Sequence, residues 1–388
     1  MAGSGQEVGM FRQMLGMVTV VGTLWLPSPS MAEPTRTLHV ANNALDSATC
    51  GAKVNPCRSI SRAIAHARDG DRILVHPGRY GDLNADGDFS DPGDEAAEVQ
   101  TGCRCMILIN KRLKVESTGG AQVTVLAAAG AVLDVVNITA SNVSFGDYGK
   151  GFTLTGAGKV TDDDGIGLDV LGGRDVRVIG NIAQGNRDAG FAIRGDNHTV
   201  RDNVSTGNGM GFSLGSDTEG HTVKENLATN NGNDEVFGHG FVVGGQKGTY
   251  EGNKAIGNRG IGFYLVLFSG TSDFEFEDNE AIGNRGAGMW VRFGAQLKVR
   301  SSNFFGNLGE SVGGSFPAAP NCGLVNDMGG PIDAARNYWG AATGPGPDPA
   351  DDAGPGSICD VNGTTVVVPF DSTPNSLLES LEGAPGAE

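Results

Sequence analysis

The sequence predicts an all-β protein, a right-handed parallel β-helix (a solenoid) with a short N-terminal capping helix. Three observations predict this fold. A pair of Asn residues five positions apart recurs at steps of 22, 23, 27 and 26 residues. A Gly followed by a large apolar residue comes after each pair. The segments between these marks are short, alternate apolar with polar residues, and contain no stretch long enough for three turns of helix.

Each repeat is expected to form one coil of three short strands separated by turns. Parallel stacking at about 4.8 Å then pairs every strand with its copy in the next coil. Equivalent residues become neighbours, so the apolar residue after each Gly should form a column inside the solenoid. This predicted stack consists of Phe191, Phe212, Phe241, Phe263 and Met289.

The paired Asn residues are expected to lie at the corners of the coils. Asn tolerates the left-handed backbone that a tight corner needs, and stacked amides can hydrogen-bond along a ladder. Neighbouring glycines such as Gly257 and Gly283 provide room for the turn. We therefore interpret these residues as architecture and not as a ligand site. The pairs are Asn181 and Asn186, Asn203 and Asn208, Asn226 and Asn231, Asn253 and Asn258, and Asn279 and Asn284.

Outward positions carry charges that register places beside one another. Lys224 should lie next to Glu251, and Glu277 next to Arg300. Such exposed pairs contribute only about 0–1 kcal/mol each. These columns are interpreted as solvated faces.

The first 32 residues have the features of an export signal. Arg12 precedes an apolar run from Met14 to Leu26, and Ser30 and Ala32 are small residues at cleavage positions. The sequence thus predicts a secreted protein, extracellular or periplasmic, whose mature chain begins near Glu33 and has no other membrane span. The net charge of −17 argues against partners such as nucleic acid or anionic lipid. The predicted organisation is 1–32 signal peptide, 33–110 cap and first coils with an acidic insertion, 111–310 coils, and 311–388 closing coils and flexible tail.

Six cysteines fit an oxidising compartment. Fifteen pairings exist, and sequence alone does not choose among them. The local pair Cys50 with Cys57 is preferred, followed by Cys322 with Cys359. Cys103 and Cys105 then remain, either as a strained structural bridge or as a redox or metal-binding pair.

Three segments carry a family resemblance. Residues 50–82, "CGAKVNPCRSISRAIAHARDGDRILVHPGRYGD", resemble the opening of secreted pectin-lyase-like β-helix proteins. Residues 165–307 look like NosD-like repeats, and "ARNYWGAATGPGP" with "VVVPF" looks like their closing segment. The resemblance implies a helix over residues 60–67 that caps the first coil. It is specific for fold but not for activity, because the family includes lyases, hydrolases, epimerases and adhesins.

The acidic insertion is a candidate calcium site. Asp82, Asn84, Asp86 and Asp88 alternate along the chain as oxygen ligands do in an EF-hand loop, with Gly87 in sixth place. Position twelve is Gly93 where a bidentate Glu is expected, so Asp91 or Asp94 would have to substitute. The alternative is a solvated acidic loop without metal.

Three histidines are candidates for a catalytic or metal-binding role. His239 lies in "FGHGF" after an insertion, which favours either a structural role or a site. The paired carboxylates of a glycoside hydrolase are not visible nearby. His198 and His221 share a column in adjacent coils, which fits edge packing or, alternatively, a metal site.

The third strand of the coils carries a candidate sugar-binding surface. Tyr264 and Trp290 should point outward, with Arg292 two residues along, a combination suited to stacking on sugar rings and binding uronate. The alternative is that a C-terminal loop covers these rings. The predicted function is binding or processing of an extracellular, acidic polysaccharide; the rival is a non-catalytic surface or adhesion module.

Catalysis is left open at this level. If the protein is an enzyme, a lyase or epimerase is favoured over a hydrolase, with His239 or Tyr264 as base and Arg259 and Arg285 as carboxylate neutralisers. No catalytic signature of a known family member is found, and the sequence does not reveal whether the protein has a protein partner.

Overall fold

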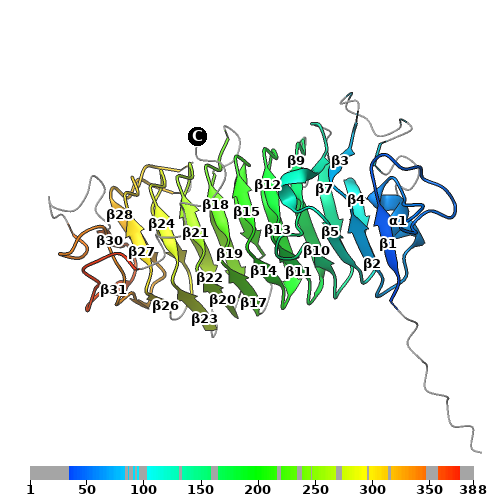
Figure 1. The fold of residues 1–388 in the computed structure, drawn as a ribbon. Coiled ribbons are helices and arrows are strands. Elements are labelled where there is room, and N and C mark those ends of the chain that lie inside the picture. The colour runs from blue at the N-terminus through cyan, green and yellow to red at the C-terminus, as the bar shows by residue number, and fades with distance from the viewer. Residues whose placement is uncertain are drawn as a thin grey trace, which may run out of the picture. The chain divides into compact units, whose positions relative to one another are not determined.

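The computed structural model describes residues 35–83, 86, 91, 94–95, 103–130, 133–158, 165–215, 220–233, 238–245, 247–267, 273–294, 297–312, 316–346 and 357–375. The predicted signal peptide, residues 1–32, lies outside these ranges. The described residues form three sheets whose inter-coil pairs are all parallel, which confirms the predicted β-helix. Strands of successive coils lie side by side in chain order (Figure 1).

Every full coil visits the three sheets in the same order. The chain passes from the twelve-stranded sheet to the nine-stranded sheet and then to the ten-stranded sheet, as β11, β12 and β13 do. The predicted columns are confirmed by the register, which pairs Val178 with Val200, Ala183 with Ser205 and Phe191 with Phe212.

The twelve-stranded sheet consists of β1 (Thr37–Val40), β2 (Arg72–Val75), β5 (Lys114–Ser117), β8 (Ser144–Phe145), β11 (Arg177–Ile179), β14 (Thr199–Arg201), β17 (His221–Lys224), β20 (Lys247–Glu251), β23 (Asp273–Glu277), β26 (Leu297–Arg300), β29 (Pro331–Asp333) and β31 (Thr364–Val366). The nine-stranded sheet consists of β3 (Gly78–Gly81), β6 (Thr124–Ala127), β9 (Thr153–Thr155), β12 (Ile182–Gln184), β15 (Val204–Thr206), β18 (Leu227–Thr229), β21 (Lys254–Ile256), β24 (Glu280–Ile282) and β27 (Asn303–Phe305).

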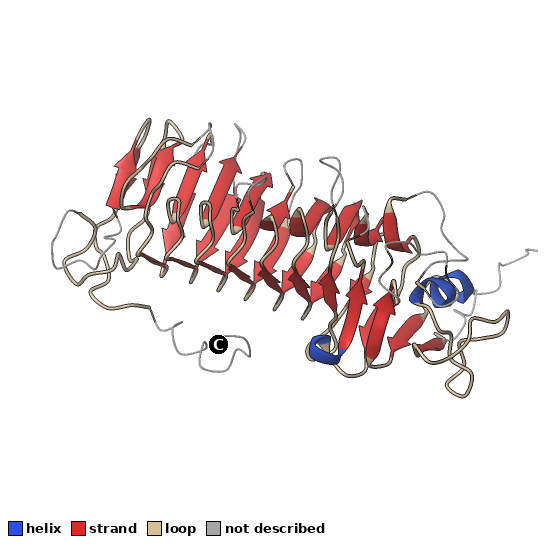
Figure 2. Cartoon of the chain, turned by 90° about the horizontal axis from the view of Figure 1, so that it is seen from above, coloured by secondary structure: helices blue, strands red, loops and turns tan. Residues whose placement is uncertain are grey.

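The ten-stranded sheet consists of β4 (Cys105–Ile109), β7 (Asp134–Ile138), β10 (Leu168–Arg174), β13 (Ala189–Asp196), β16 (Met210–Leu214), β19 (Phe241–Gly245), β22 (Phe263–Leu267), β25 (Met289–Arg292), β28 (Cys322–Asp327) and β30 (Ser357–Asp360). Two short helical elements accompany the sheets: α1 (Ile60–His66) and the 3-10 turn η1 (Ala121–Val123). Seen from above, the strands of neighbouring coils run parallel in layers (Figure 2).

The apolar columns fill the interior of the coils. Phe191, Phe212, Phe241 and Phe263 are all fully buried and stack at ring-centroid distances of 4.9, 4.7 and 4.9 Å. Offset stacking of this kind adds about 0.5–1.5 kcal/mol per pair beyond area burial. The predicted stack is therefore the core of this sheet.

Two ladders of buried Asn side chains join the coils at their corners. In the first ladder, the backbone N–H and the Nδ2 of Asn203 both donate to Oδ1 of Asn226, each at 3.0 Å. Nδ2 of Asn226 in turn donates to the Val200 carbonyl in the preceding coil. Every amide thus satisfies backbone groups that the corner would otherwise leave buried and unpaired. The first ladder continues through Ser302 Oγ to Asn337, which the sequence comparison of repeats did not place.

The expectation that the ladder Asn itself adopts the left-handed conformation is wrong. The left-handed residue is the one immediately before it, with φ between 49° and 71° in the first ladder. The Asn side chain is needed for its hydrogen bonds, and the preceding position takes the backbone strain. In the first ladder these preceding residues are Gly180, Asp202, Glu225, Gly252, Asp278, Ser301 and Arg336.

The Gly before each stacked Phe is explained by close approach between coils. A Cβ on Gly262 would lie 2.5 Å from the Gly288 carbonyl oxygen and 2.9 Å from Nδ2 of Asn284. Neither atom can move without breaking the ladder, so the position accepts only Gly.

Both predicted surface pairs are neighbours in register, but only one of the two forms an ion pair. Lys224 forms an ion pair with Glu251. Glu277 and Arg300 are register partners, but the Arg300 guanidinium pairs with Asp333 in the next coil instead.

The first coil is capped by α1, as the family resemblance implied. Oγ of Ser59 accepts a hydrogen bond from the Arg62 amide, and Glu95 accepts from the amides of Ile60 (3.1 Å) and Ser61 (2.6 Å). Burial raises the pKa of Glu95 to about 7, while these amide bonds act in the opposite direction. The end of the acidic insertion is therefore attached to the cap.

The structure contains three disulfides, which join the pairs considered from the sequence. They are Cys50 with Cys57, Cys103 with Cys105, and Cys322 with Cys359. The first lies beside α1, and the last joins β28 to β30 in the closing coils.

We predict that Asn226→Ala lowers the free energy of unfolding by several kcal/mol. The substitution removes the acceptor of the Asn203 backbone N–H, one of the two acceptors of Asn203 Nδ2, and a donor to the Val200 carbonyl. Each buried polar group left unpaired costs about 1–3 kcal/mol. Thermal unfolding followed by circular dichroism measures the change. Asn230→Gly is the matched control, since Asn230 is exposed and already has φ of 55°. Equal melting temperatures for the two variants would contradict the role of the ladder.

Candidate functional site

The outer face of the ten-stranded sheet carries an open groove of about 760 Å³. It extends from β10 across β13, β16 and β19 to β22, so it crosses several coils. Its lining is mostly small or apolar, with three charged residues. The lining includes Ala189, Ala192, Met210, Ser213, Val242, Val266 and the charged residues Asp188, Arg194 and Asp196.

A charged cluster lies at the β7–β10 end of the groove. The Arg194 guanidinium contacts Oδ2 of Asp169 at 2.5 Å, and Asp169 is almost fully buried. In the neighbouring strand Asn137 is the register partner of Asp169, and Oδ1 of Asp134 accepts from the Ile166 amide at 2.9 Å. Asp169 lies in the same outward column as Ala192, Ser213 and Val242. A charged residue next to the uncharged Ala192, Ser213 and Val242 of the same column is a signal by which the sequence could have identified Asp169.

An aromatic cluster lies at the other end of the groove. Tyr264 is the register partner of the groove residue Val242, and Trp290 is the partner of Tyr264. Both side chains belong to the outward column, as predicted. His239 contacts Tyr264 with ring centroids 5.5 Å apart.

The prediction that Trp290 is part of an exposed surface is wrong. Trp290 is 3% exposed, because Phe316 lies edge-on against it at 5.4 Å. Phe316 also makes edge contacts with Tyr264 at 4.8 Å and His239 at 5.3 Å. The alternative weighed from the sequence, cover by a C-terminal loop, is the one observed. No periodic signal could place Phe316, since it lies outside the repeats.

The covering segment is called the strap and comprises the described residues 308–312 and 316–321. Its start is held by the Glu310 amide, which donates to the Arg285 carbonyl at 2.9 Å, and by the Gly309 amide, which donates to Gly286. Val312 and Phe316 form a small apolar cluster with Ile261, Trp290 and residues of β28, separate from the main core.

The proposed catalytic residues do not converge on the groove. His239 is buried and its Nδ1 accepts from the Ile261 amide at 3.0 Å, so the ring is neutral with the proton on Nε2. Arg285 is exposed and paired with Glu310 at 2.5 Å. Arg259 is also exposed, and its Cβ lies near Gly232 and Gly238 at the corner before β19. Arg292 contacts Asp327 at 3.2 Å and lies over the Phe316 ring at 5.4 Å.

His198 and His221 form a short imidazole ladder. Their rings stack at 5.2 Å, Nδ1 of His198 accepts from the Val176 amide, and Nδ1 of His221 accepts from the His198 amide. Burial lowers the pKa of His221 to about 4. These nitrogens are engaged with the backbone, which supports edge packing over the metal alternative.

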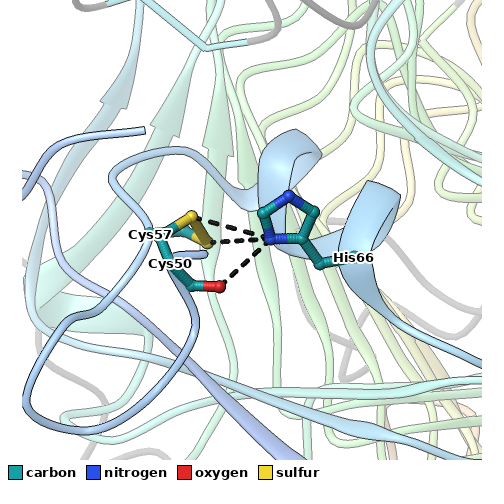
Figure 3. A group of neighbouring side chains, drawn as sticks. All are labelled: Cys50, Cys57 and His66. Atoms are coloured by element: carbon teal, nitrogen blue, oxygen red, sulfur yellow. Dashed lines mark hydrogen bonds between the residues drawn. A yellow bond between two sulfur atoms is a disulfide. The ribbon is translucent and has the colours of Figure 1, made fainter. Parts of the chain in front are cut away.

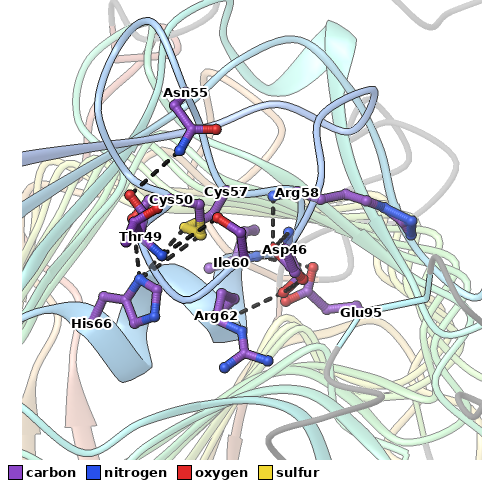
Figure 4. Close-up of a disulfide and its surroundings, with 12 residues drawn as sticks. Asp46, Thr49, Cys50, Asn55, Cys57, Arg58, Ile60, Arg62, His66 and Glu95 are labelled. Carbon is purple, nitrogen blue, oxygen red and sulfur yellow. Dashed lines mark hydrogen bonds between the residues drawn. A yellow bond between two sulfur atoms is a disulfide. The ribbon is translucent and has the colours of Figure 1, made fainter.

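Among the described residues, one group of three metal-ligating side chains comes together: Cys50, Cys57 and His66 (Figure 3). Both sulfurs are in the disulfide, and Nδ1 of His66 bonds the Cys50 carbonyl at 3.1 Å. Figure 4 shows the Cys50–Cys57 disulfide beside α1, with Asp46 near the start of the helix. In this state the group is structural.

Half of the predicted calcium loop can be placed. Asp82 is buried, Asp86 is exposed, and Asn84 and Asp88 lie outside the described residues. Asp94 accepts from the Leu83 amide at 3.0 Å, so the two ends of the insertion meet. Carboxylate oxygens are the donors that Ca²⁺ prefers.

Comparison with known proteins agrees with this architecture. Residues 164–331 match the family described as "Right handed beta helix region". The chain is a right-handed parallel β-helix. No curated protein matches the sequence. No helix among the described residues is long and apolar enough to cross a membrane.

Several solved structures are similar to this chain. Pectate lyase Pel9A is 16% identical, with 92% of this chain and 82% of that chain covered and a TM-score of 0.45. A rhamnogalacturonan lyase is 14% identical over 91% and 89%, with a TM-score of 0.46. The A-module of mannuronan C-5 epimerase AlgE6 from Azotobacter vinelandii is 16% identical over 79% and 94%, with a TM-score of 0.41. None is similar enough to transfer an activity.

We predict that His239 makes the fold sensitive to acid. Burial lowers the pKa of His239 from 6.5 to about 4. The unfolded chain therefore binds this proton below about pH 6.5, while the folded protein does not until about pH 4. Stability is retained above pH 6.5 and falls between pH 6.5 and 4, by up to roughly 3 kcal/mol from this residue.

Chemical denaturation at several pH values compares the wild type with His239→Gln. The difference between the two isolates His239, because His221 contributes equally to both proteins. Identical pH dependence in the two would contradict the assignment.

Proposed function

We propose that this protein binds an extracellular polysaccharide along the groove of the ten-stranded sheet. The observation that supports this most directly is the groove itself, which crosses β10, β13, β16, β19 and β22 without interruption. An extended ligand suits a site whose shape repeats from coil to coil. Small side chains such as Ala192 and Ser213 leave room for sugar rings on the floor.

Polar partners for sugar hydroxyls line the groove at the two ends of β13. Arg194 supplies N–H donors, while Asp188 and Asp196 supply acceptors. Arg194 is already oriented by Asp169, so its donors are held in place before a ligand arrives. Preorganised donors reduce the entropy cost of binding.

The charge of the groove restricts how an acidic glycan would bind. The groove lining contains two carboxylates, Asp188 and Asp196, and one guanidinium, that of Arg194; Asp196 is also paired with Arg174. The whole chain carries −17. A polyanion therefore needs bound cations to offset repulsion. We propose that the ligand is an acidic polysaccharide and that Ca²⁺ ions bind between its carboxylates and those of the groove. We also propose that the protein is secreted to the extracellular space or the periplasm. The groove is one proposed position for Ca²⁺, and the acidic insertion that begins at Asp82 is the second.

Binding without turnover is the form of this function that the geometry favours. The proposed base His239 is buried beneath Phe316. Arg285 is paired with Glu310, and Arg259 lies near Gly232 and Gly238. A lyase or epimerase is the second candidate, favoured by the neutral His239 in contact with Tyr264. Absorbance of unsaturated uronate after incubation with acidic glycans distinguishes a lyase from a binding module, and proton exchange at C5 detects an epimerase.

We predict that Ser213→Trp weakens glycan binding at least tenfold, because an indole on the floor fills the groove. Isothermal titration calorimetry against oligomers of galacturonate and mannuronate, and against a neutral xylan oligomer, measures the effect. Thr222→Trp on β17 is the matched control, since it adds the same side chain to an outward position of another sheet. Equal weakening by both variants would count against the groove.

We also predict that the acidic oligomers bind only when Ca²⁺ is present. Chelation with EDTA should abolish their binding and leave any binding of the neutral oligomer unchanged, since only the polyanion needs its charge offset. Acidic oligomers that bind equally well in EDTA would remove calcium from the proposal.

A further inference from the structure

We propose that His239, Tyr264, Trp290 and Arg292 form a sugar-binding subsite that the protein's own Phe316 occupies. This set is called the aromatic box. The inference rests on the proposed function, because the box is treated as the extension of the polysaccharide groove. It assigns a ligand, one pyranose ring of an acidic glycan, to a place now filled by a phenyl ring.

The box is continuous with the groove. Val242 and Val266 are the last residues of the groove on their columns. Their register partners in the next strands are Tyr264 and Arg292. A glycan that follows the groove from coil to coil would therefore reach the box at its next step, where Phe316 stands in its path.

The surroundings of Phe316 resemble a ligand site more than a core. Three rings meet Phe316 edge-to-face, with interplanar angles of 82°, 83° and 75°. A guanidinium, that of Arg292, lies over the same ring. Aromatic faces bind the C–H face of a pyranose, and a guanidinium binds a carboxylate through two donors. One box thus provides both contacts that a uronate ring needs.

An unsatisfied donor points to the missing polar partner. Nε1 of Trp290 is buried, and no described residue accepts a hydrogen bond from it. The phenyl ring of Phe316 has no oxygen or nitrogen acceptor, and its backbone carbonyl already accepts from Ser311 and Val312. A buried N–H without a partner is costly. A sugar ring in the place of Phe316 would bring hydroxyl and carboxylate oxygens beside this donor.

Phe316 then acts as a competing ligand within the same chain. The apparent affinity of the box equals its intrinsic affinity reduced by the fraction of molecules in which Phe316 has left. Removal of the phenyl ring should therefore strengthen binding of a glycan long enough to reach the box. A purely structural Phe316 would give lower stability and unchanged affinity.

The test compares binding of an acidic oligosaccharide, with Ca²⁺ present, to the wild type and to Phe316→Ala. We expect Phe316→Ala to bind at least tenfold more tightly. In the double variant Phe316→Ala with Trp290→Phe the gain should fall at least fivefold, since phenylalanine lacks the N–H. Val312→Ala is the matched control, because it loosens the same apolar cluster and keeps the phenyl ring in place.

Phe316→Leu provides a second variant if Phe316→Ala does not fold, since it keeps an apolar anchor and removes the aromatic ring. Unchanged affinity in the folded variant, or a gain that Trp290→Phe does not reduce, would overturn the inference. Wild-type binding that Ser213→Trp abolishes would in that case leave the proposed function standing. Absence of binding in the wild type and in both Phe316 variants would overturn the two proposals together.

Discussion

The structure depends on the side-chain amide ladders that hold parallel coils in one register. The two corners that flank the nine-stranded sheet bury backbone groups that no strand can pair, and the Asn Oδ1 and Nδ2 atoms satisfy them in both directions along the stack. A shift of one coil against the next by a single residue would break every rung and turn the Phe column outward. The ladder thus fixes which residues become neighbours on every face.

The outer face of the ten-stranded sheet is a direct consequence of this register. Its groove exists because Ala192, Ser213 and Val242 lie in one column of modest side chains. The same column carries Asp169 at one end and Tyr264 and Trp290 at the other. A gradient from a charged pair to an aromatic box therefore runs along one rigid surface, with little freedom for its floor to rearrange.

The strap changes which side chains of that surface are exposed to solvent. Without Phe316 the rings of Tyr264 and Trp290 would form an exposed stacking platform next to Arg292. With it, His239 loses contact with water and stays neutral, and Trp290 keeps a buried donor that no described residue pairs. Binding and any chemistry at this end of the groove are coupled to the position of one side chain.

The sequence alone determined the coil period, the Asn ladders, the interior Phe column, the capping helix and the outward direction of Tyr264 and Trp290. Repetition makes these predictable, since each residue's neighbours are its own copies in adjacent coils. The sequence alone did not determine the left-handed position before each Asn, the Arg194–Asp169 pair or the burial of Trp290. The last of these was decided by Phe316, which belongs to no repeat. Only the tertiary structure brings such a residue to the sheet, because its contacts depend on the path of an irregular segment and not on register.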